Sequence, residues 1–200
     1  MAAKKNHKPI ADFLYEVGML AKTPRSGFHF LGSGKQSVAE HLNRVAYIAY
    51  TLATLEKDVD VGEAVILALF HDLGEARTSD LNYVHQKYAN ADEAKAMEDL
   101  AKTLPFGSEL RRMVKDLREK VTREAIIAKD ADQLEWILSL KEQVDIGNSR
   151  AKTWIPSAAK RLKTRTAKEL AAEIVRTPSD HWWFSNKQDK WWVSRAGKQG

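Results

Sequence analysis

The 200-residue sequence contains no cysteine. Disulfide frameworks and thiolate metal sites are therefore excluded, so a metal would have to be held by His, Asp or Glu. Long apolar runs are also missing: the longest, residues 64–70, suits a protein core but is too short to span a bilayer. The first residues lack the uninterrupted apolar segment of a signal peptide. We therefore expect a cytoplasmic protein without a membrane partner.

The charge balance has only a modest excess of one sign. Lys and Arg number 32 against 27 Asp and Glu, which gives a net charge of +5. A basic balance suits an anionic partner such as a phosphorylated small molecule or a nucleic acid, although a mildly basic solvated surface explains it equally well. The basic residues are dispersed, without the dense patch that binds nucleic acid. We therefore expect a small anionic ligand and no nucleic acid.

Sustained alternation of apolar and polar residues is absent, so a sheet is not expected. Apolar residues recur instead at helical spacing. Residues 64–70 are apolar on all sides, which predicts that their helix is central and fully buried. We interpret residues 25–36 and 76–90 as loops, and the second loop as a mobile flap. Helices are predicted at about residues 9–21, 37–55, 61–75, 91–103, 108–119, 122–146 and 166–176.

The pattern indicates one all-α domain over residues 1–178, followed by a tail over residues 179–200. The tail carries many large aromatic side chains, and exposing so much aromatic surface to water is unfavourable. We therefore expect the tail to pack on the domain or on a second subunit, and we expect a homodimer. The large aromatic residues of the tail are Trp182, Trp183, Phe184, Trp191 and Trp192.

The pair His71-Asp72 is the central chemical signal. It lies at the end of an apolar segment, where an Asp carboxylate is costly unless something neutralises it, as a metal ion does. Adjacent side chains on a helix point about 100° apart, yet both can reach an ion at the edge between their faces. Alone, such a pair is more often a hydrogen-bonded structural pair.

Two further residues strengthen the metal hypothesis. His41 lies thirty residues upstream, in the first turns of a helix that begins with the capping box Ser37 to Glu40. Glu75 follows His71 by four residues, which places both on one helical face.

The fourth candidate ligand is Asp132, whose apolar neighbours suggest that it faces inward. Asp130 competes with it, because residues two apart cannot share a helical face. We favour Asp132 as the ligand and interpret Asp130 as a solvated acid.

These residues form the pattern H…HD…D, which resembles the HD-domain superfamily of phosphohydrolases. The resemblance extends to the YfbR-like 5'-deoxynucleotidase subgroup over about residues 9–175. The matching positions are Arg25, the segment QSVAEH at 36–41, the segment HDLGEA at 71–76 with Thr78 and Asp80, and the segment KDADQLE at 129–135.

The resemblance implies an all-α HD-domain helical bundle and a role for each matching residue. In YfbR-type members a tryptophan immediately follows the arginine and packs on the sugar, and some relatives carry an Arg-Thr-Gly-Trp segment instead. Here Ser26 follows Arg25, so we predict that Phe28 takes the place of the tryptophan. The implied metal ligands are His41, His71, Asp72 and Asp132, the implied catalytic acids are Glu75 and Asp80, and the implied phosphate-binding residue is Arg25.

The chemistry of these residue types agrees with the implied roles. Two imidazoles and two carboxylates suit Mn²⁺, Co²⁺, Fe²⁺, Ni²⁺ or Zn²⁺ better than Mg²⁺, which avoids nitrogen ligands. The ion would polarise a phosphoryl group, and Glu75 would orient or deprotonate a water. Arg25 would hold the phosphate through its bidentate fork.

The predicted function is removal of the 5'-phosphate from (deoxy)nucleoside monophosphates. One alternative is a phosphohydrolase that acts on a nucleotide triphosphate or polyphosphate. Another is a nucleotide-binding regulatory module without activity, which the presence of all four ligands together with Glu75 argues against.

Overall fold

The computed structural model describes residues 6–189, and within them every regular element is a helix. The β-type contact among the described residues is an isolated antiparallel bridge between Pro24 and Ser37. The predicted all-α fold is confirmed. No helix in the described range is long and apolar enough to cross a membrane.

The elements in chain order are α1 (Lys8–Val17), η1 (Gly18–Ala21), α2 (Gly27–Leu31), α3 (Val38–Leu55), α4 (Val61–Phe70), α5 (Glu75–Thr78), η2 (His85–Lys87), α6 (Glu93–Ala101), α7 (Gly107–Glu119), α8 (Arg123–Asp145), α9 (Ser149–Ala159), α10 (Arg165–Arg176) and α11 (His181–Phe184).

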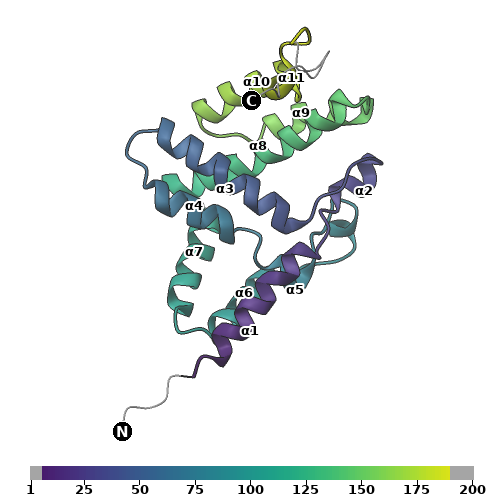
Figure 1. Cartoon of the computed structure of the whole chain (residues 1–200). Coiled ribbons are helices and arrows are strands. Elements are labelled where there is room, and N and C mark those ends of the chain that lie inside the picture. Colours follow the sequence, from purple (N-terminus) through teal and green to yellow (C-terminus); the bar gives the residue numbers. More distant parts are fainter. Residues whose placement is uncertain (1–5, 190–200) are drawn as a thin grey trace, which may run out of the picture.

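Helix α8 is the centre of the bundle. It packs against α3, α4, α9 and α10. Figure 1 shows α8 beside α3, with α9, α10 and α11 in the upper part of the view and α1, α6 and α7 in the lower part. Its residues Ala131, Leu134, Ile137 and Leu140 are fully buried. The prediction that the helix around residues 61–75 is central and fully buried is wrong, because Ile66 and Leu69 of α4 are each 44% exposed.

Helix α8 can be more buried than α4 because its polar side chains are hydrogen-bonded inside the protein. Helix α8 buries Asp130, Glu135 and Ser139 among its apolar side chains. Each is hydrogen-bonded, which removes most of the penalty of burying a polar group. A prediction from apolar content alone therefore expects α4 to be more buried than α8, whereas in the structure α8 is the more buried helix.

The capping box predicted at the start of α3 is present in the structure. Ser37 accepts a hydrogen bond from the amide of Glu40, whose side chain bonds back to Ser37, as the capping box predicts. Helix α4, in contrast, ends at Phe70 and not near residue 75. Residues 71–74 form turns before α5 begins at Glu75, so His71 and Asp72 lie at a helix end.

Some elements were not predicted. Helix α2 lies in the segment interpreted as a loop, and α5 and η2 fall within or beside the predicted flap. Helix α9 was missed because Pro156 stands inside it. Its start is capped by Asn148, whose side chain accepts from the amides of Arg150 and Ala151.

The beginning of the aromatic tail is attached to the bundle. The amide of Ser179 donates to Oδ2 of Asp145 at 2.7 Å. Trp182 is nevertheless 84% exposed and Trp183 47% exposed, so these rings are not fully covered by this chain. Trp191 and Trp192 lie outside the described residues.

Candidate metal centre and active site

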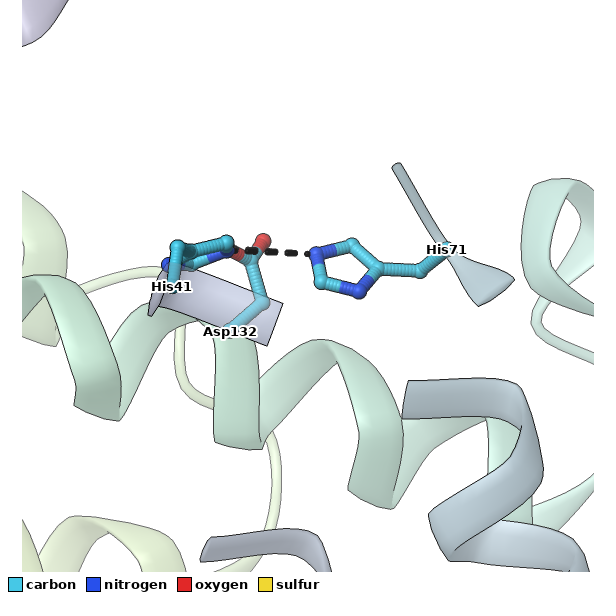
Figure 2. Close-up of side chains that lie close together, drawn as sticks. All are labelled: His41, His71 and Asp132. Atoms are coloured by element: carbon cyan, nitrogen blue, oxygen red, sulfur yellow. Dashed lines mark hydrogen bonds and ion pairs between the residues drawn. The ribbon is translucent and has the colours of Figure 1, made fainter. Parts of the chain in front are cut away.

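Three of the predicted metal ligands converge from three helices or their ends. His41 comes from α3, His71 from the end of α4, and Asp132 from α8. Nε2 of His41 lies 3.4 Å from Nε2 of His71 and 3.3 Å from Oδ1 of Asp132. Figure 2 shows the imidazole of His71 pointing toward the other two side chains. These donors form a group that can hold a metal ion.

Asp72 completes the set of four. Its Oδ2 lies 3.2 Å from Nε2 of His71 and 3.6 Å from Nε2 of His41. Neighbouring ligands on an ion with bonds of about 2.1 Å are about 3 Å apart. The separations of Asp72 from the two histidines are therefore compatible with its binding the same ion as His41, His71 and Asp132.

The hydrogen bonds of both imidazoles leave their Nε2 atoms available to a cation. Nδ1 of His71 donates to the carbonyl oxygen of Ala68 at 2.7 Å, and Nδ1 of His41 donates to Oε2 of Glu135 at 2.7 Å. Each neutral ring then carries its lone pair on Nε2. Two lone pairs facing each other at 3.4 Å repel unless a proton or a metal cation lies between them. The residues present thus fit a divalent metal.

The charges around the ligands favour a cation in the same place. Burial works to lower the pKa of His71, but the carboxylates of Asp72 and Asp132 outweigh it and raise that pKa to about 9. Burial likewise works to raise the pKa values of Asp72 and Asp132, yet the neighbouring imidazoles hold both well below their usual range. Positive charge is therefore stabilised between these side chains.

The hydrogen-bond partners of Asp130 and Asp132 show which of these two acids faces the histidines. Asp130 is fully buried and accepts from the amides of Lys163 and Thr164 at 2.8 and 2.7 Å, and from the hydroxyl of Thr164. It therefore binds the segment that begins α10. The expectation that Asp130 is a solvated acid is wrong, whereas Asp132 faces the histidines as predicted.

Arg25 and Asp80 lie together beside the ligands. Nη1 of Arg25 is 3.1 Å from Oδ2 of Asp72, and its Nε is 3.5 Å from Oδ2 of Asp80. Burial works against the charge of Arg25, but Asp72, Asp80 and other carboxylates hold its pKa above the usual value. Asp80 also accepts from the amide and the hydroxyl of Ser26. In this arrangement Asp80 positions Arg25.

Glu75 is nearly buried, at 8% exposure, and its Oε2 has no hydrogen-bond partner among the described residues. Burial, followed by the charges of Asp72 and Asp80, raises its pKa to about 9. An unpartnered buried carboxylate oxygen is unfavourable. Its place beside Asp72 is therefore suited to a ligand such as water that donates to it.

A cavity of about 470 Å³ opens over these residues. Its polar lining includes Arg25, Asp72, Glu75, Asp80 and Asp132. Phe28 is not among its lining residues; its ring is buried and makes an edge contact with Trp136 at 5.5 Å between centroids. The aromatic residues that do line the cavity are Phe30, Tyr83, Trp136 and Trp154.

The comparison with known families agrees with this geometry. The family model described as HD domain matches residues 17–174. The chain belongs to the HD domain family. The family, the all-helical fold and the hydrolase class predicted from the sequence are thereby confirmed.

The chain is similar to two named proteins and to one protein of known structure. It is 29% identical to the 5'-deoxynucleotidase HDDC2 of Bos taurus over 82% of this chain and 83% of that protein. It is 31% identical to a 5'-deoxynucleotidase of Photorhabdus laumondii over 68% of this chain and 75% of that protein. A conserved hypothetical protein of Pyrococcus furiosus has a similar structure, with a TM-score of 0.71, 31% identity and coverage of 84% of this chain and 99% of that one.

The HD domain also contains functional neighbours that the sequence reasoning missed. Glu135 bonds to His41 and accepts from Arg44, at 2.7 Å from its Nη2, and from Gln36 at 2.6 Å. These contacts lower the pKa of Glu135 to about 2, against the effect of burial. Its spacing of three residues from Asp132 was a signal, because residues three apart share a helical face.

Proposed function

We propose that this HD domain removes the 5'-phosphate from deoxynucleoside monophosphates, with a divalent transition metal held by His41, His71, Asp72 and Asp132. The observation that carries the proposal is that Arg25, Asp72 and Glu75 line one cavity, with Nη1 of Arg25 3.1 Å from Oδ2 of Asp72. The names of the relatives, which are 5'-deoxynucleotidases, support this choice of substrate.

The metal would be Mn²⁺, Co²⁺, Fe²⁺, Ni²⁺ or Zn²⁺, which accept imidazole and carboxylate ligands. When bound, such an ion polarises a phosphoryl group and neutralises its charge. Glu135 and the carbonyl oxygen of Ala68 fix the orientation of the two imidazoles through Nδ1. Such hydrogen-bonded supports hold metal-ligating histidines in one tautomer.

Arg25 binds the phosphate of the substrate. Its guanidinium is held by Asp72 on one side and by Asp80 on the other. The planar fork matches two oxygens of a phosphate and stays charged at any physiological pH. Asp80 takes a positioning role, because its oxygens already accept from Ser26.

Glu75 takes a proton from the attacking water. The oxygen of that water forms the new bond to phosphorus, while the bond from phosphorus to the 5'-oxygen breaks. The sugar oxygen takes up the proton that Glu75 accepted from the water, so Glu75 returns to its ionised form. A base must be ionised to act, and the raised pKa of Glu75 arises partly from the charge of Asp72. Neutralising Asp72 by a cation therefore favours the ionised form of Glu75.

The site favours one phosphate group over three. Among the residues that line the cavity, the arginines are Arg25 and Arg161, and Arg161 already contacts Tyr83 and Gln133. One arginine beside the ligands suits a single terminal phosphoryl group, and the sequence has no P-loop for a triphosphate.

The test is a phosphate-release screen over dAMP, AMP, 3'-dAMP and dATP, each with Mn²⁺, Co²⁺, Ni²⁺, Zn²⁺ or anaerobic Fe²⁺. We expect dAMP to be hydrolysed fastest. Faster hydrolysis of dATP than of dAMP would replace the proposal with a triphosphohydrolase. Nucleotide binding without phosphate release under any metal would indicate a regulatory module.

The predicted homodimer and cytoplasmic location belong to the same proposal. Light scattering of the purified chain measures the first, and fractionation of cells that produce it measures the second. The ring of Trp182, which is 84% exposed, supports the prediction of a second subunit.

A further inference from the structure

One part of the active-site cavity is aromatic and has no role in the metal chemistry. Trp136 of α8 and Trp154 of α9 lie with their ring centroids 6.3 Å apart and their planes at 42°. Tyr83 lines the cavity with them, and all three also line an adjoining cavity of about 210 Å³. We call Tyr83, Trp136 and Trp154 the aromatic wall.

The aromatic wall begins one helical turn from the metal ligands. Trp136 follows Asp132 by four residues on α8, so both lie on one face with an axial separation of about 6 Å. Trp154 contacts Trp136, and both also line the adjoining cavity, which Asp132 does not line. Asp132, Trp136 and Trp154 therefore follow one another along the cavity. Phosphate, sugar and base follow one another in the same way along a nucleotide.

The indole of Trp136 is fixed before any ligand binds. The ring of Phe28 meets it edge-on, with planes at 88°. A Cβ atom added to Gly27 would lie only 3.1 Å from Cη2 of Trp136, so the indole sits directly over the backbone there. A surface locked in this way loses little entropy when a flat ligand stacks on it.

Polar groups connect the aromatic wall to the metal site. The guanidinium of Arg161 lies over the ring of Tyr83, 5.3 Å from its centroid, and donates to Oε1 of Gln133 at 3.3 Å. Nε2 of Gln133 donates in turn to Oδ2 of Asp132 at 2.9 Å. Arg161 therefore brings hydrogen-bond donors to the edge of the aromatic surface, where the edge of a base carries acceptors.

We propose that the aromatic wall is the nucleoside-binding subsite: Trp136 packs on the sugar, and Trp154 with Tyr83 stacks on the base. This inference rests on the proposed function. It assigns to Trp136 the sugar contact expected of Phe28, which instead supports Trp136 from behind. Stacking depends on the π face that every base has, so the subsite binds nucleosides and selects weakly among bases.

The test compares dAMP with 2-deoxyribose 5-phosphate, which has the same phosphate and sugar but no base. Trp154→Ala should lower kcat/KM for dAMP by about 5- to 150-fold, mainly through KM, because that range corresponds to the loss of one stacked base. The value for 2-deoxyribose 5-phosphate should stay within about twofold. Trp154→Phe keeps an aromatic face and should recover most of the loss for dAMP.

Trp182→Ala is the matched control, because Trp182 is 84% exposed on α11 and does not line the cavity. Circular dichroism checks that each variant is folded. An equal loss for both substrates, or no loss for dAMP, in a folded Trp154→Ala protein overturns the inference.

A binding experiment separates this inference from the proposed function. Titration calorimetry with deoxyadenosine, which has no phosphate, measures the subsite alone. Binding to the wild type that is lost in Trp154→Ala supports the subsite even if no nucleoside monophosphate is hydrolysed. Suppose that dAMP is hydrolysed and that Trp154→Ala binds deoxyadenosine as tightly as the wild type does. That result would contradict the subsite and would still agree with the proposed function.

Discussion

Glu135 and His41 are joined by a buried hydrogen bond of 2.7 Å between Oε2 and Nδ1. The bond fixes which ring nitrogen of His41 faces the metal site. The other oxygen of Glu135 accepts from Arg44, Gln36 and Ser139, so the carboxylate has little freedom to turn. The orientation of one proposed metal ligand thus depends on a residue that is not itself among the proposed ligands.

The first prediction concerns this support. Glu135→Gln should weaken metal binding by about 10- to 100-fold, because the imidazole loses its ionised acceptor. Competition with a chelating dye measures the affinity. Glu142→Gln is the control, since Glu142 also contacts Arg44 but is exposed and does not reach His41. Equal affinities in both variants would show that Glu135 has no effect on the ion.

The second prediction separates two neighbouring acids on α8. Asp132→Ala should lose the metal and keep its fold, whereas Asp130→Ala should keep the metal and lose about 2–3 kcal/mol of unfolding free energy, because buried amide donors are left without an acceptor. Elemental analysis and urea unfolding measure the two effects. Metal loss in a folded Asp130→Ala protein would contradict the assignment.

The third prediction concerns Glu75. Glu75→Gln keeps the shape of the side chain but removes the base, so kcat should fall by about 10²- to 10⁴-fold. KM and metal content should stay near the wild-type values, because Glu75 is not among the proposed ligands. A wild-type kcat would assign Glu75 a structural role.

The fourth prediction concerns the phosphate contact. Arg25→Lys keeps the charge but loses the bidentate fork, so kcat/KM for dAMP should fall by about 10- to 100-fold. Arg77→Lys is the control, because Arg77 makes the same kind of paired contact with Glu16 away from the cavity. Similar losses in both variants would point to stability and not to phosphate binding.

The fifth prediction concerns removal of the metal. A chelator should lower the melting temperature by about 5–10 °C relative to protein with metal at 100 times its dissociation constant, since that binding adds about 2.7 kcal/mol. Differential scanning fluorimetry measures the shift. His71→Ala should show no shift on chelation, and a shift of wild-type size in that variant would place the metal elsewhere.

The sequence predicted those parts of the site that depend on local pattern. The capping box at Ser37 fixed the start of α3 and with it the place of His41. The apolar segment before His71 correctly indicated a helix that delivers this residue to the interior. Both features depend only on residues that are close together in the sequence, and periodicity and spacing describe such residues well.

The sequence did not predict contacts between distant segments. The roles of Asp130 and Glu135 follow from partners on α10 and α3, which no local pattern contains. For the same reason, the sequence led us to expect Phe28 as the substrate-binding aromatic residue and indicated no role for Trp136. Both are aromatic, and only the packing of α2 against α8 shows which ring reaches the cavity and which lies behind it.

The close approach of Gly27 to Trp136 also limits how this chain can change over evolutionary time. A methyl group at position 27 would lie 3.1 Å from the indole and would have to displace it. A larger residue at 27 is therefore accommodated best together with a smaller one at 136. Among descendants of this sequence, the two positions should vary as a pair with a roughly constant total volume, and the sugar-facing surface should pass from α8 to the segment after Arg25 when they do.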